Sequence, residues 1–86
     1  MKYRSVATPK FWEAYDRLPS HIQTRAKKQF ELFSADPLHR SLHLKRVGDL
    51  WSVRISKAYR ALATRNGDEF AWVWIGTHDE YDRLLD

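Results

Sequence analysis

The residues best suited to chemistry lie in the second half of the chain: Arg54, Lys57, Arg60, His78 and Tyr81. The three cations follow one another without an intervening acid, and the imidazole and the phenol come just after the last apolar run. An arginine can hold two phosphate oxygens at once, and a histidine can give or take a proton near neutral pH. This set suits a phosphodiester better than an apolar ligand.

Metal-independent RNA cleavage uses the 2′-hydroxyl as nucleophile and needs a base, an acid and cations for the phosphorane charge. Arg54 and Arg60 are the candidates for holding the phosphate, His78 for proton transfer, and Tyr81 for stacking a base or orienting a phosphate. Other roles stay open for each type. The histidine could cap a helix, the arginines could form surface ion pairs, and the tyrosine could belong to the core.

The charge distribution favours a polyanionic partner. The formal net charge is +4 with an isoelectric point near 9.6, and Asp49 is the single acid between Arg40 and Arg65. Lys and Arg contacts to phosphate dominate nucleic-acid affinity, although a solvated sheet face is the alternative explanation. We predict that three further cations of this block position an RNA backbone. They are Lys45, Arg46 and Lys57.

Neither a metal nor an organic cofactor is expected. The chain has no cysteine, and the ligand-like spacing of His39 and His43 lacks a convincing carboxylate as third ligand. No apolar run approaches the ~18 residues of a membrane span, and the N-terminus leads into no apolar leader segment. A cytoplasmic protein without a membrane partner is therefore expected.

Helical periodicity in the first half predicts two helices. Thr8-Pro9 begins the first, Pro19-Ser20 separates the two, and Asp36-Pro37 ends the second. The stripes predicted to be buried are Phe11, Trp12, Tyr15 and Leu18 in the first helix, and Ile22, Ala26, Phe30 and Phe33 in the second.

Alternating patterns in the second half predict strands, joined by turns at Gly48-Asp49, Lys57-Ala58 and Asn66-Gly67. The predicted strands cover 43–47, 51–56, 59–65 and an internal 70–75, with a weak signal at 2–6. A short helix over 79–85 would place Tyr81, Leu84 and Leu85 on a common side, and tryptophans 12, 72 and 74 are assigned to the core. The expected fold is α+β: one compact domain, 1–86, with an N-terminal helical hairpin on an antiparallel sheet of four to five strands.

The order of these elements resembles the RelE/ParE superfamily, the toxins of type II toxin–antitoxin pairs. The similarity is sharpest at Trp51-Ser52-Val53-Arg54-Ile55 with Ala58-Tyr59-Arg60, and at Ile75-Gly76-Thr77-His78-Asp79-Glu80-Tyr81, which is similar to the tail of YafQ-type ribonucleases. The chain departs from relatives at Ser52, where RelE itself has a lysine, and in having His78 alone where YafQ-like enzymes use several histidines.

The resemblance implies a ribosome-dependent mRNA endoribonuclease that inhibits translation. It implies that Arg54 and Arg60 contact the scissile phosphate, His78 transfers protons and Tyr81 supports or stacks at the tail. The implied partners are the ribosome with its mRNA, and a cognate antitoxin that covers the basic surface or displaces the tail. Two alternatives remain: a ParE-like inhibitor of DNA gyrase, and a catalytically inert relative that binds antitoxin.

Overall fold

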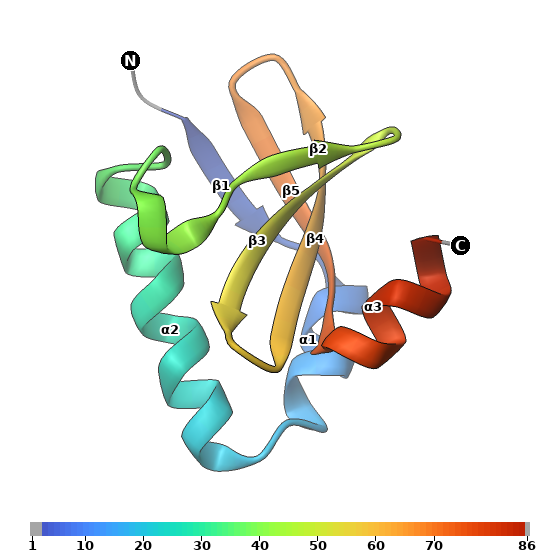
Figure 1. Ribbon diagram of the computed structural model, residues 1–86. Helices are drawn as coiled ribbons and strands as arrows, with labels where there is room; N and C mark the ends of the chain where they lie inside the picture. The colour runs from blue at the N-terminus through green and yellow to red at the C-terminus, as the bar shows by residue number, and fades with distance from the viewer. Residues whose placement is uncertain (1–2, 86) are drawn as a thin grey trace.

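The computed structural model describes residues 3–85 and combines a five-stranded sheet with three α-helices (Figure 1). The elements in chain order are β1 Arg4–Ala7, α1 Pro9–Asp16, α2 Ser20–Ala35, the 3-10 helix η1 Arg40–Leu42, β2 Lys45–Val47, β3 Leu50–Ser56, β4 Tyr59–Asn66, β5 Glu69–Thr77 and α3 His78–Leu85. None of the helices in this described part is long and apolar enough to cross a membrane.

The sheet has the strand order β1-β5-β4-β3-β2. Strands β2 to β5 form an antiparallel meander, as expected from their turns. Strand β1 differs, because it pairs with β5 in parallel. The α+β prediction is confirmed, with the correction that the sheet is mixed at this one edge.

The helices begin and end where the local signals place them. The Thr8 hydroxyl accepts a hydrogen bond from the backbone N–H of Phe11 at 3.3 Å, and Pro9 occupies the first turn of α1. Helix α2 ends at Ala35, directly before Asp36-Pro37. These two helices form the predicted hairpin.

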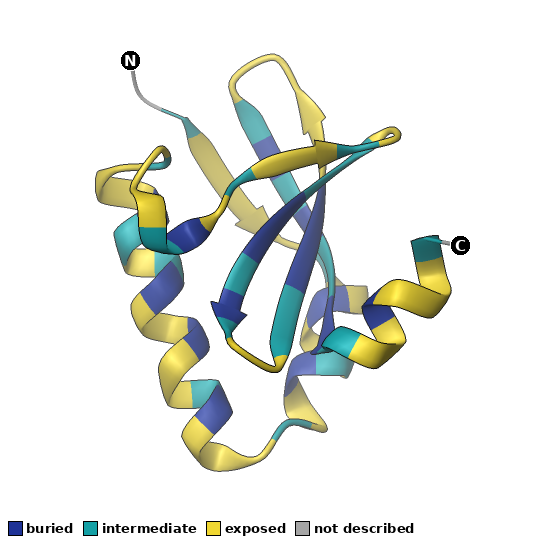
Figure 2. Cartoon of the chain, viewed as in Figure 1, coloured by how far each residue is buried: buried dark blue, intermediate teal, exposed yellow. Residues whose placement is uncertain are grey.

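Helices α1 and α2 cover one face of the sheet, and both carry buried residues (Figure 2). An aromatic cluster fills the space between them. The Phe33 ring meets Phe70 and Trp72 edge-on, with centroids 5.1 and 5.3 Å away. One predicted core residue is corrected: Trp12 is 48% exposed, whereas Phe11 and Tyr15 of the same helix are buried. Leu84, expected on the same side of its helix as Tyr81, is 58% exposed although Tyr81 is buried.

Two predicted turns shift in detail. Asn66 pairs with Glu69 as the last residue of β4, so the tight loop is Gly67-Asp68, with Gly67 at φ 60°. The strand expected from position 43 begins instead at Lys45. His43 follows η1 with a left-handed φ of 46°, which is incompatible with a strand.

The second face of the sheet carries α3 (Figure 1). This helix buries Ser52, which is 2% exposed even though the alternation of β3 points it away from the main core. Several of the site residues predicted from the sequence lie on this face: Arg54, Arg60 and Lys45 project from the strands, and Tyr81 packs against it from α3.

Candidate active site

Two arginines face each other on the sheet surface that carries α3. Arg54 of β3 and Arg60 of β4 are directly paired, and paired residues project their side chains to the same side. Arg60 is in turn paired with Gly76 of β5, which contributes no side chain beyond it. The structure therefore brings together the two residues predicted to hold the phosphate.

The Arg60 guanidinium also closes the turn between β3 and β4. Its Nη1 donates to the carbonyl oxygens of Ser56 at 2.6 Å and Tyr59 at 2.9 Å. Burial lowers the pKa of Arg60, and the nearby charge of Arg54 lowers it further. The Nη1 of Arg60 thus stabilises the turn, while its Nε and Nη2 donate to none of the described residues.

The remaining predicted cations do not share one surface. Lys45 of β2 pairs with Ser52 and therefore lies on the same face as the arginine pair. Its neighbour Arg46 pairs with Trp51 on the opposite face, where its Nε donates to the Gly48 carbonyl at 2.9 Å. Lys57 lies exposed in the turn between β3 and β4. The site geometry includes Lys45 and Lys57 and leaves Arg46 out.

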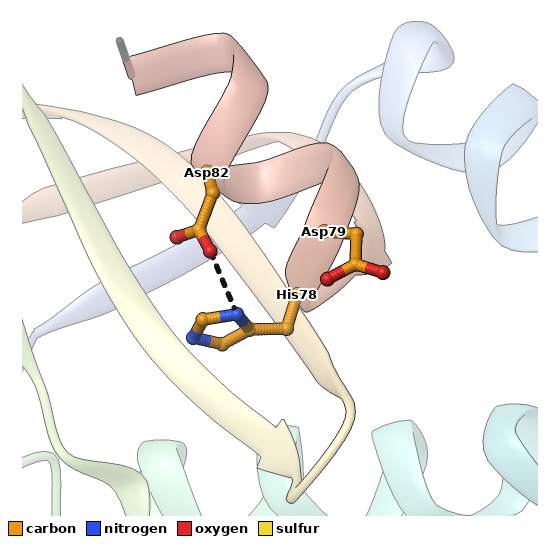
Figure 3. A group of neighbouring side chains, drawn as sticks. All are labelled: His78, Asp79 and Asp82. Atoms are coloured by element: carbon orange, nitrogen blue, oxygen red, sulfur yellow. Dashed lines mark ion pairs between the residues drawn. The ribbon is translucent and has the colours of Figure 1, made fainter.

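His78 is the first residue of α3, at the end of the sheet where the arginines lie. Its backbone N–H donates to the carbonyl of Ala58 in the β3–β4 turn at 2.7 Å. Its Nδ1 lies 3.1 Å from Oδ2 of Asp82, one turn along the helix, and Nε2 points away from that carboxylate (Figure 3). The His78 side chain is 44% exposed.

Helix α3 starts at this position because Thr77 and Glu80 form a capping box. The Thr77 hydroxyl accepts from the Glu80 N–H at 3.2 Å, and the Glu80 carboxylate accepts from the Thr77 N–H at 3.1 Å. The pKa of Glu80 is lowered, mainly by the hydrogen bond from the Thr77 backbone N–H and next by a second one that the Thr77 hydroxyl donates to the same carboxylate. Gly76 precedes the box, and a Cβ there would lie 2.5 Å from the Trp74 ring.

Tyr81 anchors α3 to the sheet. Its hydroxyl donates to Oγ of Ser52 at 3.2 Å, and its side chain is 5% exposed. Stacking of a base on this ring would require α3 to move, so the geometry favours the supporting role for Tyr81. Its ring also lies beside the His78 ring, with centroids 5.7 Å apart.

Ser52 and Asp82 are the site residues that the sequence reasoning missed. The spacing of four between His78 and Asp82 was a usable signal, because residues four apart on a helix are neighbours. Ser52 offered a weaker one, as a small polar residue next to the arginine pair. Its burial depends on α3, which no pattern within β3 reveals.

A metal could be considered at one place in the described chain, where ligand atoms of His78, Asp79 and Asp82 lie within 4.8 Å of one another (Figure 3). All three lie at the surface, and one His78 nitrogen is already used by Asp82. The histidine pair weighed from the sequence has a local role instead. His39 accepts a hydrogen bond from the Ser41 N–H at 3.2 Å at the start of η1, and His43 follows its end.

The chain matches the family model described as a ParE-like toxin domain over residues 20–83. No curated protein sequence matches it. Among solved structures, it is similar to the RelB–RelE antitoxin–toxin complex of Methanococcus jannaschii (TM-score 0.74, 18% identity, 94% of this chain and 99% of that chain). It is also similar to YafQ of E. coli (TM-score 0.73, 8% identity, 93% of this chain and 98% of that chain). A third similar structure is a mutant E. coli RelE in the free state (TM-score 0.70, 15% identity, 98% of this chain and 92% of that chain). The structural matches show a shared fold, and the family match extends over most of the chain. The chain belongs to the ParE-like toxin domain family, within the RelE/ParE superfamily of type II toxin–antitoxin toxins.

Proposed function

We propose that this toxin is an endoribonuclease that cuts mRNA on the ribosome and thereby inhibits translation, without a catalytic metal. One observation carries the proposal: the opposed Arg54–Arg60 pair and His78 meet at one end of the sheet. The backbone of His78 is bonded to Ala58, in the turn that the Arg60 guanidinium closes. The three side chains predicted to act on a phosphodiester thus belong to one small structural unit.

The reaction is an internal transesterification. The 2′-hydroxyl loses its proton to a base, its oxygen bonds to phosphorus, the P–O5′ bond breaks, and the 5′-oxygen gains a proton from solvent water. His78 would take the first proton, and Arg54 with the unengaged nitrogens of Arg60 would stabilise the charge on the phosphorane oxygens. Lys45 and Lys57 would position the neighbouring phosphates. The products carry a 2′,3′-cyclic phosphate and a 5′-hydroxyl.

A cognate antitoxin is the second partner in this proposal. Similar structures from Methanococcus jannaschii and Pyrococcus horikoshii are complexes of RelE with RelB. The formal charge of +4 and the cations of the α3-bearing face would attract an acidic or amphipathic antitoxin segment. Such a segment could inhibit by covering the arginine pair or by displacing α3.

The test is induction in bacterial cells with mapping of new RNA 5′ ends across translated messages. Wild type should give translation-dependent cuts with 5′-hydroxyl ends, and His78→Ala and Arg60→Ala should each relieve the growth arrest. His21→Ala is the matched control, because His21 lies exposed on α2, away from the site, and should leave the cuts unchanged. Full toxicity of both site variants would show that the site is wrongly assigned.

A ParE-like inhibitor of DNA gyrase is the second candidate, favoured by the description of the matching family model. Gyrase inhibition needs no proton transfer, so it should survive His78→Ala. Arrest without RNA cuts, together with inhibition of supercoiling by purified gyrase, would move the assignment to this function. Neither arrest nor cuts would favour an inert relative that binds antitoxin.

A further inference from the structure

We propose that Asp82 is a positioning residue that fixes the imidazole of His78 so that Nε2 is the proton-accepting atom. The inference rests on the proposed nuclease function and names the atom that would serve it. Its basis is the contact between Nδ1 of His78 and Oδ2 of Asp82 at 3.1 Å (Figure 3).

The tautomer follows from the donor and acceptor inventory. A neutral imidazole carries one N–H, and an ionised carboxylate can only accept a hydrogen bond. The proton of neutral His78 therefore lies on Nδ1, facing Asp82, and the Nε2 lone pair is left for the 2′-hydroxyl. When Nε2 takes the proton, the same carboxylate stabilises the resulting imidazolium.

The rest of the fold restrains the His78 ring in ways that agree with this role. The backbone N–H of His78 is tied to Ala58, and the adjacent ring of Tyr81 is itself held by Ser52. Asp82 supplies the restraint on rotation of the imidazole about its own bonds. Because the His78 backbone is held by Ala58 and its ring by Asp82, the imidazole presents one defined nitrogen to the substrate.

Asp79 provides a matched control on the same helix. The charged and titratable groups near the imidazole are Asp79, Tyr81 and Asp82 of α3. Arg60, with Arg54 across from it, lies close enough to Tyr81 and Asp82 for their charges to act on it. Asp79 has the same charge as Asp82 and lies within the same cluster, but its carboxylate makes no ion pair with the His78 ring. Asp79→Asn and Asp82→Asn therefore change the net charge equally, and only the second removes the contact.

The first measurement needs no nuclease activity: the imidazole nitrogen shifts of His78 by NMR in the purified chain. Wild type should show the Nδ1–H tautomer, Asp82→Asn should increase the Nε2–H tautomer, and Asp79→Asn should resemble wild type. An Nε2–H tautomer in wild type, or equal effects of the two substitutions, would overturn the proposal.

The second measurement is the cleavage rate of ribosome-bound mRNA as a function of pH. Asp82→Asn should slow cleavage by about tenfold or more, and should move the acidic limb of the profile to lower pH. Asp79→Asn should change neither. Equal losses in both variants, together with loss of activity in a chelator, would identify the cluster as a metal site and refute the positioning role. If wild type cuts no RNA, the proposed function fails, and the NMR result alone decides whether Asp82 sets the tautomer.

Discussion

The hydrogen bond from the Tyr81 hydroxyl to Ser52 makes a quantitative prediction about how α3 is held. Both side chains are almost fully buried, and each hydroxyl has the other as its partner. Tyr81→Phe or Ser52→Ala should each lower the free energy of unfolding by about 1–2 kcal/mol, because a buried hydroxyl then lacks a partner. The double substitution removes both groups and should cost about as much as one single substitution, which corresponds to a coupling of about 1–2 kcal/mol.

The assay is urea unfolding followed by tryptophan fluorescence, with the two single variants, the double variant and wild type. In thermal unfolding of the same variants, each kcal/mol lost from the free energy of unfolding should lower Tm by about 4–8 °C in a chain of this size. Tyr15→Phe is the control, because its hydroxyl donates to the Gln23 carbonyl at 3.4 Å within the helical layer. Combined with Ser52→Ala, it should give additive losses. Additivity of the Tyr81 and Ser52 losses to within about 0.5 kcal/mol would refute the reasoning.

Three further predictions concern the ends of the site. Hydrogen bonds from Thr77 lower the pKa of Glu80 below its ordinary 4.5, so their stabilisation is complete above pH 4.5 and is lost as the pH falls through the lowered pKa. The free energy of unfolding should therefore fall between about pH 7 and about pH 3, and Glu80→Gln should make this fall smaller. Lys45→Ala should reduce the salt dependence of binding to 2′-O-methylated single-stranded RNA by about one phosphate contact, a slope change of about 0.7, and Arg46→Ala, on the opposite face, should leave the slope unchanged. Gly76→Ala should cost about 1–3 kcal/mol in urea unfolding, because its Cβ would lie 2.5 Å from an indole carbon.

Local signals in the sequence predicted most of the elements. Proline and threonine mark the start of α1, and the change of period after Pro37 marks the meander. Adjacent strand residues point to opposite faces, so the separation of Lys45 from Arg46 was also contained in the sequence. It was missed because the two were grouped by charge and not by strand register.

Other features depend on contacts between distant segments. The parallel pairing of β1 depends on β5, the last strand of the chain, and nothing near Arg4 specifies that neighbour. Trp12 fits the helical stripe of α1, yet the core ends before it. Ser52 has the alternation of an outward-facing residue, and its burial comes from Tyr81 on α3. In each case the local pattern is satisfied, and the arrangement of distant segments decides the exposure of the side chain or the direction of the strand pairing.

The arginine pair shows how the fold and the proposed chemistry oppose each other. Like charges placed directly across two strands are destabilising, and the effect of Arg54 on the pKa of Arg60 expresses that repulsion. The structure offsets it locally, because the carbonyls of Ser56 and Tyr59 accept hydrogen bonds from Arg60. Under the proposed function, a phosphate bound between the two guanidiniums would offset the remaining repulsion, and this relief would contribute to its binding. A carboxylate at either position would form an ion pair across the two strands, so stability alone would favour a pair of opposite charges here.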